Sequence, residues 1–216
     1  MQLLINIFLS YLMGSISGSM VCGKLKGIDI RTMGSGNAGG TNALRSMGFL
    51  FALGVILIDI SKGIIAVVFI SNLFFIDPLL VSTELAQILC GLSAVIGHVY
   101  PIYYNFKGGK GAGTLIGIIG VLFPQSILIT LSSWLIILIL TGFVGLGTMI
   151  AGIVLVITTA YLHPSGLYSP FGYFSIIMAL FIIYTHRSNI MRMINGKENR
   201  FEKIMIFKKL FSYLYN

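Results

Sequence analysis

Seven apolar runs alternate with polar or glycine-rich segments along the chain. Most of the runs are close to the ~20 residues that a helix needs to cross the hydrocarbon core of a bilayer. Their approximate bounds are 3–22, 48–75, 85–104, 112–123, 125–141, 145–162 and 171–185. The pattern predicts an all-α fold built from membrane-spanning helices.

Two local features refine these helices. The fourth run is short, and Pro124 separates it from the fifth. Helices usually end at or before the residue that precedes a proline, which favours two helices over one very long one. A single kinked span is the alternative. Within the first run, Gly14 and Gly18 form a G-x-x-x-G pattern, which predicts close packing against another helix.

The distribution of positive charge predicts the orientation. Of the fourteen Lys and Arg residues, all except Lys62 lie in segment 24–45, in segment 107–110 or after position 186. The positive-inside rule places these three segments in the cytoplasm. An even number of spans must then join the second segment to the third. Four such spans give a seven-helix bundle with the N-terminus outside and the C-terminus cytoplasmic, whereas two would give five.

Composition excludes an ordinary soluble domain, because 56% of the residues are hydrophobic and 9% are charged, with a mean hydropathy of +0.97. We expect one membrane domain over 1–216, with a helix bundle at 1–186 and a basic, interfacial tail at 187–216 that is attracted to anionic lipid. The first positive charge, Lys24, follows the first apolar run, so no cleavable signal peptide is expected.

The segment 34–45 is polar and rich in glycine, although it lies between two apolar runs. Glycine allows positive φ and close approach of a ligand, so that successive N–H groups can converge on an anion. Arg45 adds a planar cation that suits phosphate, and we expect it to lead into the N-terminus of the next helix. A phosphate cradle is predicted, and a flexible connection is the alternative. The polar and glycine candidates here are Gly34, Ser35, Gly36, Asn37, Thr41 and Asn42.

Two further clusters repeat this chemistry. The segment 107–114 alternates lysine with glycine at the predicted start of a helix, and its candidates are Lys107, Gly108, Gly109, Lys110, Gly111 and Thr114. Simple anchoring of lysines at the membrane interface would not explain the glycines. At the end of the last span, His186 and Asn189 would share a helical face, and Glu198 could hold a cation or orient a histidine.

Asp59 and Lys62 are an ionisable pair deep inside an apolar run, three residues apart and therefore on one helical face. A charge near the bilayer centre costs about 2.5–3.5 kcal/mol on insertion scales, so such residues usually face a pathway or a site. The alternative is a structural pair whose charges neutralise each other, and the pattern leaves both open. His98, considered alone, is interpreted as a packed helix residue.

Four segments, in this order, make the chain resemble the bacterial acyl-phosphate:glycerol-3-phosphate acyltransferase family (the PlsY type), integral enzymes of phospholipid synthesis. They are GSGNAGGTNALR at 34–45, DISKG at 59–63, GHVYPIYYNFKGGKGAGT at 97–114 and HRSNIMRMINGKE at 186–198. The resemblance covers nearly the whole chain. Departures from the family pattern are Gly40 and Gly113, where alanine is more frequent, and Gly142 and Gly145, where relatives carry a basic residue and a serine.

The resemblance implies transfer of a fatty acyl group from an acyl phosphate to the 1-hydroxyl of glycerol 3-phosphate, giving lysophosphatidic acid and phosphate. It also implies a multi-pass protein of the inner (plasma) membrane with its active site facing the cytoplasm. The expected partners are acyl phosphate, glycerol 3-phosphate and membrane lipid, with no nucleic acid, metal or organic cofactor. A transporter for a phosphorylated anion, the competing class, would favour internal repeats, and the sequence contains none that we recognise.

An acyl phosphate is an activated mixed anhydride, so direct transfer is favoured over a covalent acyl-Ser35 intermediate. In this hypothesis Arg45 and Lys110 hold glycerol 3-phosphate, which Asn42 and Asn189 orient. His186 is either the general base or a substrate-orienting residue, and deprotonation by substrate phosphate is the alternative. The predicted catalytic residues are Ser35, Lys110, His186 and Asn189. The predicted substrate-binding residues are Gly34, Gly36, Asn37, Thr41, Asn42, Arg45, Lys107, Gly108, Gly109, Gly111, Thr114 and Glu198.

Overall fold

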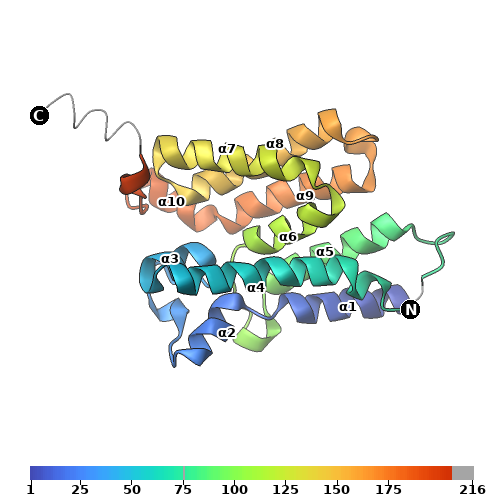
Figure 1. Ribbon diagram of the computed structural model, residues 1–216, viewed down its shortest axis with the longest axis horizontal. Coiled ribbons are helices and arrows are strands. Elements are labelled where there is room, and N and C mark those ends of the chain that lie inside the picture. The colour runs from blue at the N-terminus through green and yellow to red at the C-terminus, as the bar shows by residue number, and fades with distance from the viewer. Residues whose placement is uncertain (75, 206–216) are drawn as a thin grey trace, which may run out of the picture. The chain divides into compact units, whose positions relative to one another are not determined.

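The computed structural model describes residues 1–74 and 76–205, and the regular structure in these two ranges is entirely helical (Figure 1). The all-α prediction is therefore confirmed there. Phe75, the last residue of the second apolar run, and residues 206–216 of the predicted interfacial tail lie outside the described residues. The chain forms two compact units, Met1–Pro124 and Gln125–Asn216.

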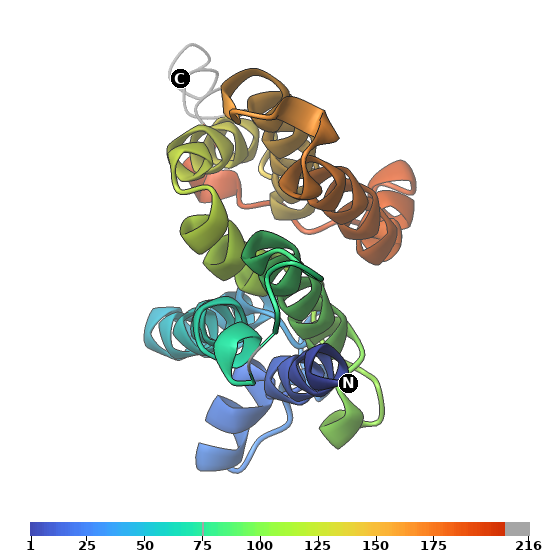
Figure 2. The same ribbon diagram turned by 90° about the vertical axis from the view of Figure 1, so that its right-hand side faces the viewer.

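The first unit is built around α4 (Phe49–Val68), which packs against α5 (Thr83–Val99) and α6 (Ala112–Leu122). Figures 1 and 2 show α1 running beside α4 and α5. The remaining elements of this unit are α1 (Gln2–Gly14), α2 (Gly18–Leu25), η1 (Ile30–Thr32), α3 (Gly40–Met47), η2 (Ile70–Asn72) and η3 (Ile102–Tyr104). The short elements η1, α3 and η3 flank the glycine-rich segments.

The second unit is an antiparallel arrangement in which α8 (Val144–Leu162) packs against α7 (Gln125–Thr141) and α9 (Pro170–Thr185). Ser169 caps α9 by accepting a hydrogen bond from Gly172 N at 2.9 Å, and Pro170 occupies the first turn, where its missing N–H has no cost. The other elements are η4 (Gly166–Tyr168), α10 (Arg187–Ile194) and η5 (Glu202–Ile204).

The helix boundaries follow the apolar runs closely. Pro124 separates α6, which ends at Leu122, from α7, which begins at Gln125, so the prediction of two helices is confirmed. Ser82 supplies a sequence-readable start for α5, because its side chain accepts a hydrogen bond from Leu85 N.

The first apolar run contains a break that its composition does not show. It forms α1 and α2, which are bent by 44°. Gly14 and Gly18 lie on either side of this break, and both are tightly packed: a Cβ at Gly14 would overlap the backbone of Ala94, and one at Gly18 would crowd Val55 O. The predicted close packing is confirmed, although the two glycines do not lie on one continuous helix.

Several helices are long and apolar enough to cross a bilayer. Within the described ranges there are three by length and composition alone, Phe49–Asn72, Thr83–Tyr104 and Val144–Leu162. The bent pairs α1–α2 and α9–α10 raise the number to five if each is one span, and α6 and α7 are shorter apolar helices. The count of seven and the orientation of the termini stay predictions.

Candidate active site

Asn42 braces the first glycine-rich loop, which runs from η1 to α3. Its Oδ1 accepts a hydrogen bond from Ser35 N at 2.9 Å, and its Nδ2 donates to Ile30 O at 3.2 Å and to Met33 O at 3.0 Å. The residue is only 2% exposed. The sequence assigned Asn42 to orienting the substrate, whereas the structure shows its amide bonded to the loop itself.

Glycine is required where this loop turns. Gly34 has φ +56°, and a Cβ there would overlap Asn42 Oδ1, while Gly36 has φ +72°. Both are left-handed conformations that side chains disfavour. The turn leaves Ser35 exposed and Asn37 half-buried, so the predicted polar donors lie at the surface of the loop. Thr41, in the first turn of α3, is also half-buried.

Arg45 occupies a different position from the one expected. It lies in the last turn of α3, and the next apolar helix, α4, begins only after Gly48. The expectation that Arg45 leads directly into a helix N-terminus is wrong. The N-terminus is instead at Gly40, inside the glycine-rich segment, because glycines 39 and 40 serve as N-cap and first helical residue. The positive end of α3 therefore faces the loop.

The second glycine-rich loop is attached to the end of α5. Gly108 N donates to Val99 O at 3.2 Å, and Gly109 N donates to His98 O at 3.1 Å. Donation from these two N–H groups to a ligand, as the sequence suggested, would have to break these bonds. The loop ends at Gly111, the N-cap of α6, whose φ of +92° lets the chain turn into the helix.

The two loops meet within the first unit. A Cβ added at Gly109 would lie 3.1 Å from Ala38 O of the first loop, so the backbones are in close contact there. Lys110, next in the chain, is half-buried. Thr114, by contrast, is fully buried in the first turn of α6 at 0% exposure. The first and second predicted clusters are thus neighbours, as a shared site requires.

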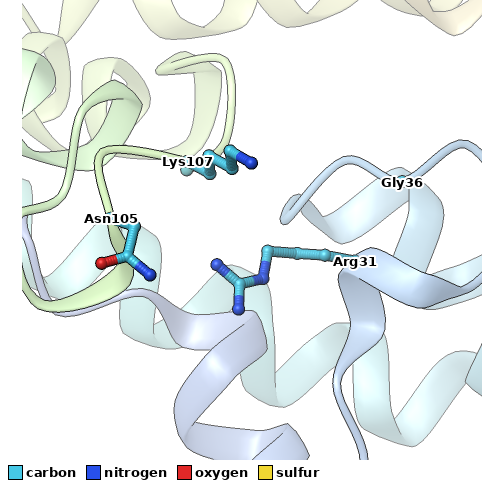
Figure 3. A pocket seen from close by; sticks show the side chains of 5 residues that line it. Arg31, Gly36, Asn105 and Lys107 are labelled. Atoms are coloured by element: carbon cyan, nitrogen blue, oxygen red, sulfur yellow. The ribbon is translucent and has the colours of Figure 1, made fainter.

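A pocket of about 340 Å³ lies where the two loops approach each other. Figure 3 shows Arg31 extending toward Asn105, with Lys107 across the pocket, and the lining residues are Arg31, Gly36, Asn105, Lys107 and Gly108. Two cations and an amide around an open cavity form a place that an anionic ligand can occupy. Gly36, Lys107 and Gly108 were predicted site residues from the sequence, whereas Arg31 and Asn105 were not.

Arg31 links the two loops. It forms an ion pair with Asp29, at 2.7 Å between Nη2 and Oδ2, and its Nη1 donates to Tyr104 O at 3.2 Å. The hydrogen bond from Arg31 lowers the pKa of the Asp29 carboxyl below its ordinary value, and the same bond raises the pKa of Arg31. The short Asp-x-Arg spacing before the glycines was the signal available in the sequence.

Asn105 and Phe106 make the turn that presents Lys107. Both are non-glycine residues with positive φ, +54° and +58°. Such conformations cost on the order of 1–3 kcal/mol each and cluster at functional sites. The turn is held by Phe106 N, which donates to Pro101 O at 2.9 Å.

In the second unit, His186 lies at the junction of α9 and α10. Its Nδ1 is 2.8 Å from Ile182 O, and because a carbonyl can only accept, Nδ1 must carry the proton. In the neutral form of this tautomer the lone pair lies on Nε2, the atom that could accept a proton from a substrate.

Asn189, in the first turn of α10, is held by Glu198. Asn189 Nδ2 donates to Glu198 Oε1 at 2.9 Å, and Arg192 Nε donates to Glu198 Oε2 at 2.7 Å. The side chain of Glu198 is 4% exposed, so this carboxylate is buried with both oxygens paired. Of the two roles that the sequence offered for Glu198, the structure shows that of holding a cation.

The turn between α7 and α8 contacts this cluster at the two departures from the family pattern. A Cβ at Gly145 would lie 3.0 Å from Asn189 Cγ and Nδ2. Gly142 has φ +73°, and its carbonyl accepts from Phe201 N at 2.9 Å. Arg200 also stacks over the ring of Phe143 at 4.6 Å from its centroid. Residues 200–205 thus dock on a turn that the absence of a side chain at 142 makes accessible, while the absence of one at 145 leaves room for Asn189.

Known proteins resemble this chain over nearly its whole length. The family model described as glycerol-3-phosphate acyltransferase matches residues 4–196. Proteins of that name from Chlorobaculum parvum and Chlorobium limicola are 41% and 38% identical, covering 90% and 93% of this chain and 94% and 97% of their own lengths. Among solved structures, PlsY, an integral membrane glycerol 3-phosphate acyltransferase, matches in its glycerol 3-phosphate form with a TM-score of 0.80 at 34% identity, covering 92% of this chain and 95% of the other. Its lysophosphatidic acid form matches with a TM-score of 0.78 at 32% identity, with the same coverage.

Proposed function

The chain belongs to the glycerol-3-phosphate acyltransferase family, and we propose that it moves a fatty acyl group from an acyl phosphate to the 1-hydroxyl of glycerol 3-phosphate. It is an integral membrane protein of phospholipid synthesis, like the relatives that share its fold. The observation that carries the proposal is the meeting of two glycine-rich loops, the second of which bears lysine, around an open pocket in the first unit. The PlsY structures hold glycerol 3-phosphate and lysophosphatidic acid, the acceptor and the product of such a transfer.

The donor follows from the chemistry that the described residues offer. In an acyl phosphate the carbonyl carbon is already activated, so the enzyme needs to position two anions and an acyl chain rather than supply a nucleophile. Ser35 is exposed on a surface loop, and its N–H is used by Asn42. We assign the Ser35 hydroxyl to the donor phosphate, because an activated acyl donor needs no covalent carrier.

The proposed reaction is a direct substitution. The 1-hydroxyl oxygen attacks the carbonyl carbon, the bond from that carbon to the bridging oxygen breaks, and phosphate leaves with the bonding electrons. Arg45 and Lys110 hold the phosphate of the acceptor, while Ser35 and Asn37 face the donor. The hydroxyl proton passes either to Nε2 of His186, whose Nδ1–H is fixed on Ile182 O, or to the leaving phosphate.

The topology belongs to the same proposal. Three long apolar helices, two bent pairs and the shorter helices α6 and α7 would together supply seven spans. With the basic segments in the cytoplasm, the N-terminus lies outside and the glycine-rich loops face the inner side of the plasma membrane. Seven spans within a single membrane domain would bring His186 and Asn189 to the same membrane face as Arg45 and Lys110, where one doubly anionic site would use all of them.

Donor choice tests the proposal. The chain is purified in detergent and supplied with glycerol 3-phosphate and one of three donors carrying the same acyl chain: acyl phosphate, acyl-CoA or acyl-carrier protein. We expect lysophosphatidic acid from acyl phosphate alone. Turnover with acyl-CoA or acyl-carrier protein, at rates equal to or above that with acyl phosphate, would overturn the donor assignment and leave the family membership untouched.

A further inference from the structure

Three ionisable side chains are buried together in the first unit. Asp59 and Lys62 of α4 are joined at 3.1 Å between Oδ1 and Nζ, and His98 Nδ1 at the end of α5 lies 3.4 Å from the same carboxylate oxygen. Each residue is 2–3% exposed. Burial of this kind inside apolar helices requires that each charge be paired, and here the Asp59 carboxylate pairs with Lys62 and also lies beside the His98 ring.

The ion pair also closes the break between α1 and α2. Lys62 Nζ donates to Gly14 O and to Ile16 O, both at 2.8 Å, and Asp59 Oδ1 accepts from Gly18 N at 3.2 Å. Helix ends leave such carbonyl and N–H groups without partners inside the helix. The Lys62 cation meets the negative end of α1, and the Asp59 carboxylate meets the positive end of α2. Asp59 is therefore held in place by both Lys62 and the N-terminus of α2.

His98 connects the Asp59 carboxylate to the second glycine-rich loop. Its carbonyl accepts from Gly109 N at 3.1 Å, and a Cβ added at Gly109 would overlap its ring Nε2. One edge of the imidazole therefore lies against Asp59 and the other against the loop that precedes Lys110. A rotation of the ring away from Asp59 would displace Gly109.

We propose that His98, oriented by the Asp59–Lys62 pair, is a positioning residue that sets the placement of Lys110 and hence the affinity of the site for glycerol 3-phosphate. The proposal rests on the proposed function for the identity of that substrate. His98 acts through the loop and has no contact with the reacting atoms. Its loss therefore raises the KM for glycerol 3-phosphate more than it lowers kcat, and leaves the KM for acyl phosphate near the wild-type value.

The test compares His98→Phe, which keeps a ring but loses the nitrogen facing Asp59, with His98→Asn, whose amide nitrogen can occupy the place of Nδ1. We expect His98→Phe to raise the KM for glycerol 3-phosphate by about tenfold and His98→Asn to restore most of it. Ser93→Ala is the matched control, because Ser93 is a buried polar residue of the same helix whose hydroxyl donates to Ile7 O at 2.8 Å, away from the loop. The control is expected to change thermal stability without changing either KM.

Two outcomes overturn the proposal while the function stands: an unchanged KM for glycerol 3-phosphate in His98→Phe, or an equal effect in Ser93→Ala. Should His98→Phe not fold, the double variant Asp59→Asn/Lys62→Met carries the same test, because it removes both charges and frees the ring. Binding of glycerol 3-phosphate, measured by calorimetry without donor, separates the test of the His98 role from the test of the proposed donor chemistry. A wild-type chain that binds glycerol 3-phosphate but makes no product would refute the proposed donor chemistry, and His98→Phe would still have to weaken that binding.

Discussion

Lys110 and Arg45 are the two cations that we assign to glycerol 3-phosphate. Replacing either with alanine should lower kcat/KM for glycerol 3-phosphate by about a hundredfold, since a charge-assisted contact to the reacting complex is lost. Steady-state kinetics of the purified variants measure this.

Lys24→Ala provides the comparison for these variants, because Lys24 is an exposed cation in the last turn of α2 and lines neither loop. It should keep wild-type kinetics. Normal kinetics in both Arg45→Ala and Lys110→Ala would remove the assignment.

Asp29 gives a pH-dependent prediction. Its pKa is lowered from 3.8 in the folded protein by the hydrogen bond from Arg31, so its stabilising contribution is complete above 3.8 and is lost as pH falls through the lowered pKa. Asp29→Asn should therefore destabilise the protein at neutral pH and converge with wild type in acid. The difference should be about 0.5 kcal/mol, because both partners are partly exposed.

Thermal unfolding in detergent between pH 3 and 7 measures this difference. A gap between wild type and Asp29→Asn that stays constant across the range would show that the ion pair with Arg31 contributes nothing to folding.

At the scale of single residues, the sequence predicted which residue types the loops need better than it predicted what each side chain contacts. Glycine at 34, 36 and 111 and the charges of the loops could be recognised because backbone freedom and charge are local properties. The bracing by Asn42 could not, since its partners, Ile30 and Met33, are ordinary apolar residues whose carbonyls carry no sequence signal. For the same reason Arg31 was counted as a topology marker, although its side chain joins two loops.

Among the elements, apolar runs and Pro124 predicted the helices, because length and hydropathy are encoded within each segment. The bends between α1 and α2 and between α9 and α10 could not be predicted from length and hydropathy. The break between α1 and α2 depends on Lys62 and Asp59, which lie more than forty residues further along the chain. Arg45 was misplaced because the start of α3 falls on two glycines, residues that usually indicate a loop.

The ion pair of α4 makes a prediction about folding. Lys62→Met should destabilise the first unit by about 3–5 kcal/mol, since it leaves the buried Asp59 carboxylate without its cation. Asp59→Asn/Lys62→Met should be the milder change, because it removes both charges. Thermal denaturation in detergent ranks the two variants. A loss of stability in the double variant that equals or exceeds the loss in Lys62→Met would show that the Asp59–Lys62 ion pair does not stabilise the junction of α1 and α2.

For the whole molecule, the family and the membrane class were readable from the order of four motifs and from composition, and the comparisons confirm both. The arrangement of each unit follows from its own contacts. The gathering of His186 and Asn189 with the loops of the first unit into one site stays a prediction, because it depends on packing between segments far apart in the chain.

Direct transfer between two bound anions is the central claim, and the balance of products with and without acceptor tests it. Purified protein is mixed with acyl phosphate, and released phosphate and lysophosphatidic acid are counted. We predict equal amounts of the two when glycerol 3-phosphate is present, and no phosphate beyond spontaneous hydrolysis when it is omitted. Phosphate released in proportion to the protein without acceptor, together with an acylated chain, would contradict direct transfer.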